Sequence, residues 1–269
     1  MGWVAPHLTG GLGNRLFEYA AAAGLAEKWG REVVFFLPRC QETGHGAFDN
    51  IFKLLPSVRI VETDAHWETL LEQRNNMYRY TPFSDTPVEG NVLIQGYRQT
   101  EKYFPSKGVH LDFENAIGKE RLKKLSLPTL HTSWFLHVRL GDYKILPHHQ
   151  VDLRRYYIAC LQQIPKGHKV YFFSDEPELC VEAFRGICSQ LSIPFDVCTL
   201  TDELETLYLM SHCKAGAITA NSTFSWWGAY LAHQDCSPDF KAFYPTIWGQ
   251  QMPPPIDIIP TWGSAIDVD

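Results

Sequence analysis

The stretch WVAPHLTGGLGNRLFEYAAAAGLAEKWGREVVFFL, residues 3–37, predicts a strand, a glycine-rich turn, a helix and a second strand. Residues 3–8 are a short apolar run, and residues 15–29 carry apolar side chains at helical spacing. Gly30 is typical of a residue that ends a helix, and residues 32–37 are typical of a buried strand. Because two strands joined through a helix run parallel, this segment predicts a βαβ unit whose first turn lies where parallel sheets bind ligands.

The second half of the chain alternates strands and helices more regularly than residues 38–125 do. Helices of about 10–15 residues between short apolar runs predict a parallel sheet with helices on both faces. We therefore predict an α/β protein of two halves, residues 1–128 and 129–269, with a break near residues 125–131. Further strands are expected at 58–62, 92–95, 134–138, 169–174, 195–198 and 215–220. Further helices are expected at 67–73, 113–125, 153–164, 178–191, 203–211 and 224–232, with a helical turn at 101–104 and a surface strap or tail at the proline-rich residues 253–255.

Composition and charge exclude several classes of protein. The chain of 269 residues is 45% hydrophobic and 20% charged, which excludes a disordered, collagen-like or coiled-coil protein. Its 24 Lys and Arg against 30 Asp and Glu give a net charge of −6. This balance argues against a nucleic-acid binder, because such proteins need a basic face. A local basic pocket for a phosphorylated small molecule stays compatible with it.

The spacing of cysteines and histidines indicates which cellular compartment and which metal chemistry to expect. The seven cysteines show no CxxC spacing, so we interpret most of them as small buried residues in a reducing compartment. No signal peptide precedes the glycine-rich turn, and the uncharged run 215–234 holds polar residues near its middle. We therefore expect no transmembrane segment, although peripheral contact with a membrane stays open. The eleven histidines lack HExxH spacing, and we expect no obligatory metal.

The glycine-rich turn GGLGN, residues 10–14, is the first candidate binding motif. Glycines let a backbone approach an anion, and the following helix directs its first N–H groups toward it. As a dinucleotide-binding fingerprint the motif is incomplete, because Leu16 stands at the third glycine position, although Glu32 lies about where a ribose-binding acid would. A tight turn for packing and a phosphate contact both stay open.

The segment HVRLGDY, residues 137–143, is the second candidate. It begins in the last residues of a predicted strand, where open parallel sheets bind ligands. Arg139 could hold a diphosphate through two hydrogen bonds and keep its charge at any working pH. Alternatively, Arg139 and Asp142 form an ion pair that holds the loop. His137 is as compatible with a core position as with a catalytic base.

Two further polar segments follow predicted strands. In SDE, residues 174–176, Asp175 could accept hydrogen bonds from a base or a ribose, or Ser174 or Asp175 could cap the next helix before Pro177. In NSTFSWWG, residues 221–228, amide and hydroxyl groups beside a helix start could cradle an anion. Simple capping with two core tryptophans is the alternative, but the segment holds more polar residues than a cap needs.

Five segments together resemble one known family. They are GGLGNRLFEYA (10–20), VLIQGYRQTEKYF (92–104), HVRLGDY (137–143), YFFSDE (171–176) and LYLMSHCKAGAITANSTFSWWGAYLA (207–232). They are spread over nearly the whole chain in the family's order, and the last is highly specific. The chain is similar to the α-1,2-fucosyltransferase family, glycosyltransferase family 11, and to its bacterial and viral members in particular.

The resemblance implies a GT-B architecture, with two Rossmann-like domains facing a cleft, an acceptor-side N-terminal domain and a nucleotide-sugar-binding C-terminal domain. It implies inverting, metal-independent transfer of L-fucose from GDP-fucose to a galactose-type hydroxyl of a glycan, in α-1,2 linkage. The expected partners are therefore a nucleotide sugar and a glycan acceptor, not a nucleic acid. Because 269 residues leave no room for an anchor, we expect a cytoplasmic enzyme of the bacterial or viral type, or an excised soluble catalytic domain.

On the matching residues, the resemblance assigns Arg139 to the donor diphosphate. Asp142 is the first candidate for the base that takes the acceptor proton, with His137 and Glu101 behind it, and a mechanism poor in bases stays open. The expected donor-binding residues are Gly11, Gly13, Asn14, Arg15, Arg139, Asp175, Asn221, Ser222, Thr223 and Ser225. The expected acceptor-side residues are Gln95, Tyr97, Arg98 and Glu101.

Three residues depart from the family's pattern. Arg15 replaces the glutamine of GGLGNQ, Leu140 replaces the second arginine of HxRRGDY, and Arg98 stands where an aromatic residue is frequent. We therefore hypothesise that Arg15 or Arg98 restores the positive charge that is lost at Leu140. Three other functions stay open: transfer from another nucleotide sugar such as a deoxysugar donor, non-catalytic binding of a nucleotide sugar or glycan, and nicotinamide-dependent oxidoreduction, which Leu16 disfavours.

Overall fold

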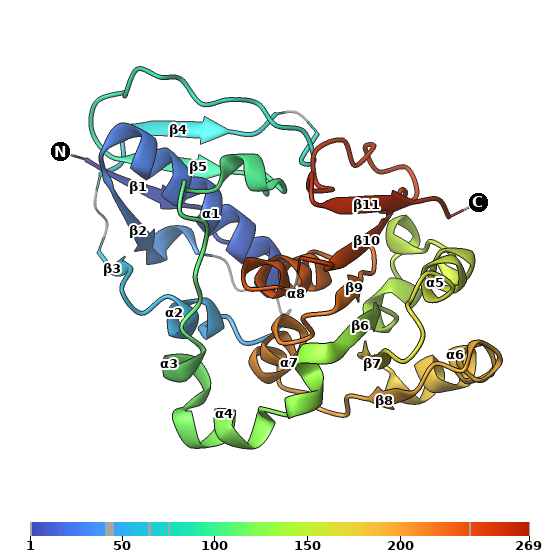
Figure 1. Ribbon diagram of the computed structural model, residues 1–269. Helices are drawn as coiled ribbons and strands as arrows, with labels where there is room; N and C mark the ends of the chain where they lie inside the picture. The colour runs from blue at the N-terminus through green and yellow to red at the C-terminus, as the bar shows by residue number, and fades with distance from the viewer. Residues whose placement is uncertain (1, 41–45, 64–65, 75, 237, 269) are drawn as a thin grey trace. The chain divides into compact units, whose positions relative to one another are not determined.

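The computed structural model describes residues 2–40, 46–63, 66–74, 76–236 and 238–268. The chain divides into two compact units, and each contains its own parallel sheet (Figure 1). Unit 1 comprises Met1–Gly118 and Pro255–Ile258, and unit 2 comprises Lys119–Pro254 and Ile259–Asp269. The first boundary thus lies N-terminal to the one expected between residues 128 and 129.

Unit 1 is built on five parallel strands in the order β3-β2-β1-β5-β4. The helix α1 (Leu12–Trp29) begins after Gly11 and ends at Gly30, whose φ of 62° is the left-handed conformation that glycine adopts readily. Its inner face packs with Val4 and Ile94 on one side of the sheet. The strands are β1 (Trp3–Pro6), β2 (Glu32–Phe36), β3 (Arg59–Val61), β4 (Thr69–Glu72) and β5 (Val92–Gln95). The predicted βαβ unit of residues 3–37 is therefore confirmed.

Two helices predicted between residues 67 and 125 differ in the structure, and the second crosses from unit 1 into unit 2. Residues 67–73 contain the strand β4, which pairs with β5, and its side chains alternate between half-buried and exposed. That period of two belongs to an edge strand and not to a helix. The predicted helix 113–125 is two short helices, α3 (Phe113–Ile117) and α4 (Lys119–Leu125), because Gly118 takes a φ of 92° between them. The short α2 (Asn50–Leu54) was not predicted, and the turn expected at 101–104 is present as η2 (Glu101–Tyr103).

Unit 2 is built on six parallel strands in the order β11-β10-β9-β6-β7-β8. The strands are β6 (Ser133–Val138), β7 (Lys169–Ser174), β8 (Phe195–Val197), β9 (Gly216–Ile218), β10 (Lys241–Pro245) and β11 (Gly263–Ile266). The helices are α5 (Arg154–Leu161), α6 (Pro177–Leu191), α7 (Glu203–Ser211) and α8 (Thr223–Gln234), and η3 (Pro128–Thr132), η4 (Gly141–Lys144) and η5 (Pro147–His149) are short 3-10 helices. The sequence missed β10 and β11, since neither is a long apolar run; β10 is fixed by its pairing with β9.

Helices cover both faces of the unit 2 sheet, as predicted. Trp134, Leu136 and Phe172 point to the face on which α5 and α6 pack, and their neighbours along each strand point the other way. On the opposite face, a Cβ placed on Gly228 of α8 would lie 2.9 Å from Met210 of α7 and 3.4 Å from Phe135, so glycine permits this close packing. Within the described residues, no helix is long and apolar enough to cross a membrane.

Candidate functional site

The carboxyl edge of the unit 2 sheet is the candidate site. The chain proceeds from β6 outward through β7 and β8, whereas β9, on the other side of β6, leads to β10 and β11. Ligands of open parallel sheets bind at such a reversal of strand order, beyond the carboxyl ends of the strands. The segments that leave this edge begin with Arg139 after β6, Asp175 after β7 and Asn221 just beyond β9. The predicted residues of unit 2 therefore share one edge.

Arg139 is held between two carboxylates. Its Nη2 lies 2.6 Å from Asp142 Oδ1, and its Nη1 lies 2.9 Å from Asp175 Oδ2. Asp175 Oδ1 also accepts the N–H of Leu140 at 2.9 Å. The three side chains remain 32%, 26% and 24% exposed, in the order Arg139, Asp142, Asp175, so water and small ligands can reach them. The ion pair that the sequence left open is present, and it includes a second carboxylate.

Gly141 is what lets Asp175 approach the loop after β6. A Cβ on Gly141 would lie 2.3 Å from Asp175 Oδ2, too close for any real side chain. Below the guanidinium, the ring of Tyr143 lies 5.6 Å from Arg139 Cζ, and the Tyr143 hydroxyl donates to the carbonyl of Asn221 at 3.1 Å. The loops after β6 and β9 are therefore tied together beside Arg139.

His137 has the surroundings of a core residue. It is buried in β6, its ring centroid lies 6.0 Å from that of Phe224, and its carbonyl accepts the hydroxyl of Tyr157 at 2.9 Å. Burial, and next the positive charge of Arg139, lower the pKa of His137 to about 3. Its Nδ1 has no hydrogen-bond partner among the described residues. These surroundings favour the core interpretation of His137 over the base.

The segment after β9 both caps α8 and presents its N-terminus at the site. Ser222 is the N-cap, with Oγ accepting the N–H of Phe224 at 3.3 Å, and Thr223 is the first helical residue. Ser225 Oγ donates to the carbonyl of Ser222 and accepts the N–H of Ala220, and Asn221 Nδ2 donates to the carbonyl of Trp248 at 3.0 Å. Asn221 and Ser225 thus shape the segment from inside. The capping alternative at 174–177 takes a different form, because Glu176 is the N-cap of α6 and Ser174 Oγ accepts its N–H.

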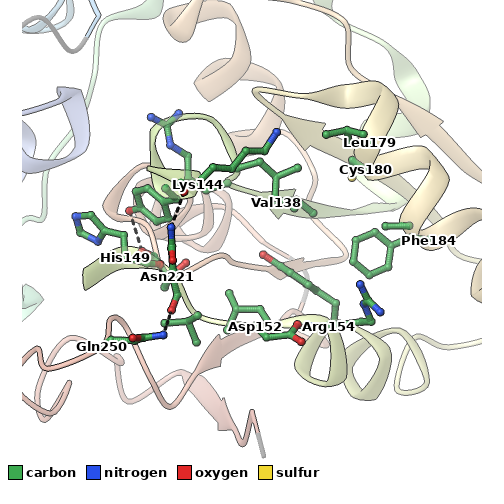
Figure 2. A pocket seen from close by; sticks show the side chains of 18 residues that line it. Val138, Lys144, His149, Asp152, Arg154, Leu179, Cys180, Phe184, Asn221 and Gln250 are labelled. Carbon is green, nitrogen blue, oxygen red and sulfur yellow. Dashed lines mark hydrogen bonds between the residues drawn. The ribbon is translucent and has the colours of Figure 1, made fainter. Parts of the chain in front are cut away.

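A cavity of about 470 Å³ opens beside Arg139 (Figure 2). Leu179 and Phe184 of α6 form an apolar wall at one end, and His149 and Asn221 lie at the other. Polar groups at its rim include Lys144, which is ion-paired with Glu176. The full lining is Val138, Arg139, Leu140, Tyr143, Lys144, His149, Gln150, Val151, Asp152, Leu153, Arg154, Tyr157, Leu179, Cys180, Ala183, Phe184, Asn221 and Gln250. An apolar wall with a few polar groups is typical of a small-molecule site.

In unit 1, the predicted residues lie at the end of β5 or on the segments that follow β1 and β5. Asn14 Oδ1 accepts Gln99 Nε2 at 3.0 Å, which joins the glycine turn to the segment after β5. Gln95 ends β5, Tyr97 follows it, and Glu101 begins η2. Burial, and next the carboxyl of Glu18, raise the pKa of Tyr97. Gly11 and Gly13, the N-cap and an early residue of α1, lie in the same turn.

The hypothesis that Arg15 supplies charge at the site finds no support in the structure. Arg15 is 1% exposed, and its guanidinium donates to the carbonyls of Gly10 at 2.9 Å, Ala47 at 3.2 Å and Phe48 at 2.8 Å. Its Cζ also lies 5.0 Å from the ring centroid of Phe48. These bonds make Arg15 a packing residue of unit 1, because its donors are directed at backbone carbonyls.

Arg98, the other arginine of that hypothesis, is also enclosed in unit 1. Its Cζ lies 4.7 Å from the ring of Phe83 and 5.5 Å from that of Tyr103, and Nη2 donates to the carbonyl of Leu71 at 3.1 Å. Burial lowers the pKa of Arg98. Its backbone takes a φ of 46°, a region that few non-glycine residues adopt. Two aromatic rings and a backbone carbonyl therefore surround the Arg98 guanidinium.

Sequence reasoning missed Glu18 and His7 in unit 1. Glu18 is 2% exposed, and its Oε2 accepts the N–H of Thr9 at 2.8 Å. Burial and the nearby Arg39 lower the pKa of His7, whose Nε2 is buried without a partner among the described residues. For Glu18, the available signal in the sequence was a charged residue within a predicted helix rich in alanine and leucine, which indicates a buried carboxyl group. Across the described part of the chain, no three His, Cys, Asp or Glu residues gather where they could hold a metal ion.

Comparison with known proteins identifies the family. The model of the family described as Glycosyl transferase family 11 matches residues 5–237. The chain is 29% identical to an alpha-1,2-colitosyltransferase of Escherichia coli, over 87% of this chain and 89% of that one. It is 24% identical to a galactoside 2-alpha-L-fucosyltransferase of Caenorhabditis elegans, over 87% of this chain and 68% of that one.

Solved structures share the fold. The fucosyltransferase NodZ from Bradyrhizobium matches with a TM-score of 0.51 and 16% identity, over 86% of this chain and 94% of that one. POFUT1 in complex with GDP-fucose matches with a TM-score of 0.50 and 13% identity, over 90% and 98%. The predicted GT-B type of α/β fold, with two Rossmann-like parallel sheets, is therefore confirmed. Together with the family match over most of its length, this shows that the chain belongs to glycosyltransferase family 11 and is a glycosyltransferase.

Proposed function

We propose that the enzyme transfers L-fucose from GDP-fucose to a galactose-type hydroxyl of a glycan, with inversion and in α-1,2 linkage. Arg139 carries this proposal, because it places a guanidinium at the strand-order reversal of unit 2, next to the loop that begins α8. The relative from Caenorhabditis elegans is named for the same transfer. POFUT1, which shares the fold, was crystallised with GDP-fucose.

Stabilisation of the leaving diphosphate is the step that this edge serves best. When the bond to the sugar breaks, negative charge develops on the diphosphate, and fixed donors aimed at it lower the barrier. Arg139 can offer two parallel N–H donors, and the N-terminus of α8 at Ser222 and Thr223 directs backbone N–H groups to the same edge. We propose that these groups stabilise the negative charge of the leaving diphosphate well enough for the reaction to proceed without a metal ion.

The donor must compete with the two carboxylates that hold Arg139. Asp142 and Asp175 each occupy one Nη of the guanidinium, so a bound diphosphate has to displace or share at least one of them. Once released, Asp175 is free to accept hydrogen bonds from the base or ribose, as its position after β7 predicts. Asp142 stays the first candidate for the base, because it is a quarter exposed and adjoins Arg139, with Glu101 as the alternative.

For unit 1 we propose the roles that its sequence predicts. Gly11, Gly13 and Asn14 form a turn that opens α1, and we assign this turn to the donor diphosphate as a second contact. Gln95, Tyr97 and Glu101 are assigned to the acceptor, which makes unit 1 the acceptor-side domain and unit 2 the nucleotide-sugar domain. We do not assign Arg15 and Arg98 to ligand contact in this proposal, because both side chains are buried.

A second donor is favoured by one specific observation. The relative that is 29% identical is named a colitosyltransferase, and colitose is fucose with one hydroxyl removed. An enzyme that hydrogen-bonds the extra hydroxyl of fucose rejects colitose strongly, whereas a pocket that lacks that contact discriminates weakly. We therefore keep GDP-colitose as the alternative donor for the same reaction.

Product analysis with the purified chain tests the proposal. We would incubate it with GDP-fucose or GDP-colitose and a panel of galactosides, and determine the linkage and anomeric configuration of any product by NMR. An α-1,2-fucosylated galactoside, absent with Arg139→Ala, is the expected product. Faster transfer from GDP-colitose selects the alternative donor. Binding of GDP without transfer to any galactoside would instead indicate a glycan or nucleotide-sugar binder.

A further inference from the structure

The glycine turn of unit 1 is braced from inside by two side chains of the helix that it precedes. Glu18 Oε2 accepts the N–H of Thr9 at 2.8 Å, and Arg15 Nε donates to the carbonyl of Gly10 at 2.9 Å. Residues three apart on a helix lie on the same face, so Arg15 and Glu18 can both reach the turn. One side chain thus fixes a backbone donor of the turn, and the other fixes the adjacent backbone acceptor.

The second oxygen of Glu18 is the unusual feature of this brace. Oε1 is buried and has no hydrogen-bond partner among the described residues. An ionised carboxylate in this position would leave a negatively charged oxygen unsolvated, which is far more costly than a neutral acid. Burial raises the pKa of Glu18 well above its usual range, and the Thr9 N–H and Arg15 only partly oppose this.

The other titratable groups around Glu18 are consistent with a neutral acid. Arg15 lies on the same helix, Tyr97 follows β5, and Cys40 follows η1 (Leu37–Arg39). Burial, and further the Glu18 carboxyl, raise the pKa of the Cys40 thiol to about 12, so this neighbour stays neutral. The Arg15 guanidinium donates to three backbone carbonyls, and its positive charge opposes the rise in the pKa of Glu18 less than burial causes it.

We propose that Glu18, as a neutral carboxylic acid, and Arg15 are positioning residues that hold the glycine turn in the shape the donor diphosphate needs. The identity of the turn's ligand, the donor diphosphate, rests on the proposed function, whereas the brace and the neutral state of Glu18 do not. Ionisation of Glu18 above its raised pKa would place an unpaired charge inside the brace and loosen the turn. Stability should therefore fall as the pH rises above about 4.5, the usual value for a free glutamate, and through the raised pKa of Glu18.

Thermal unfolding of the wild type and two variants across pH tests the brace without any substrate. Glu18→Gln keeps an acceptor for Thr9 and cannot ionise, so we expect its Tm to exceed that of the wild type by a margin that widens from about pH 5 to about pH 9. Glu27→Gln is the matched control, because Glu27 lies on the same helix, is exposed and has a lowered pKa through its bonds to Ser106. Its Tm should run parallel to the wild type over this range. A margin for Glu18→Gln that stays constant with pH would overturn the proposal.

Kinetics separate positioning from chemistry. Glu18→Gln should keep kcat and the donor KM within about threefold, whereas Glu18→Ala, which removes the bond to Thr9, should raise the donor KM more than it lowers kcat. A folded Glu18→Gln protein that loses more than about 100-fold in kcat at every pH would show that Glu18 transfers a proton, and would overturn the positioning role. If the wild type transfers no sugar at all, the proposed function fails, but the Tm comparison still decides the state of Glu18.

Discussion

Each unit has an arginine beside one or two carboxyl groups at the carboxyl edge of its sheet, and the two arginines differ in burial. In unit 1, Arg15 is 1% exposed, with its donors on backbone carbonyls and the carboxyl of Glu18 nearby. In unit 2, Arg139 is 32% exposed and held by Asp142 and Asp175. A buried guanidinium bonded to carbonyls cannot exchange partners without leaving them unpaired, whereas a half-exposed one can exchange a carboxylate for a phosphate. We therefore expect Arg15 to contribute mainly to stability and Arg139 mainly to the reaction.

Removal of Arg139 should give the largest effect on activity. We expect Arg139→Ala to lower kcat by about 100-fold or more, because the leaving diphosphate loses a fixed cation. Its Tm should stay near that of the wild type, since Asp142 and Asp175 are exposed enough to be hydrated. Steady-state kinetics and thermal unfolding measure both. Arg121→Ala is the matched control, because it removes an arginine that pairs with Glu205 (Nη2 to Oε2, 2.7 Å) away from the site. Activity of Arg139→Ala within tenfold of the wild type would show that another residue stabilises the leaving group.

Removal of Arg15 should lower stability, in contrast to removal of Arg139. Arg15→Ala leaves the carbonyls of Gly10, Ala47 and Phe48 without their donor and opens a cavity under the Phe48 ring. We expect the free energy of unfolding to fall by about 2–4 kcal/mol. Urea denaturation followed by fluorescence measures this loss. An Arg15→Ala protein of normal stability that has lost transfer would place Arg15 in the chemistry and break the contrast with Arg139.

Periodicity predicted most of unit 2 and much of unit 1, because its signal is local. The strands β6, β7, β8 and β9 and the helices between them follow apolar runs and helical spacing that the chain shows directly. The strand β4 was taken for a helix, and β10 and β11 were missed, because pairing with a neighbouring strand decides such short segments. Likewise, the sequence shows that Arg15 and Arg98 are charged, but only tertiary packing buries them among carbonyls and aromatic rings.

His137 provides a second comparison between a buried group and the exposed Arg139 at the same edge of the unit 2 sheet. Its pKa of about 3, lowered mainly by burial, means that the folded protein binds fewer protons than the unfolded chain below about pH 6.5. Stability should therefore fall as the pH drops, by about 2 kcal/mol between about pH 6.5 and 5. Denaturant titrations at both pH values, compared with His137→Gln, measure this difference. A histidine that titrates near its ordinary value by NMR would restore His137 as a candidate base.

Gly141 offers the smallest and most specific test of the Arg139 cluster. In Gly141→Ala, the new Cβ would lie 2.3 Å from Asp175 Oδ2, so the Asp175 carboxylate must move away from Arg139 and from the N–H of Leu140. We expect kcat/KM to fall about tenfold, because Arg139 loses one of the two carboxylates that orient it. Stability should change little, since the cluster is exposed. Gly186→Ala is the matched control, because a Cβ there meets no atom within 4 Å, and alanine in a helix stabilises slightly. Equal activity of the two alanine variants would mean that Asp175 does not orient Arg139 for catalysis. Asp142 would then be the only one of the two carboxylates that orients Arg139.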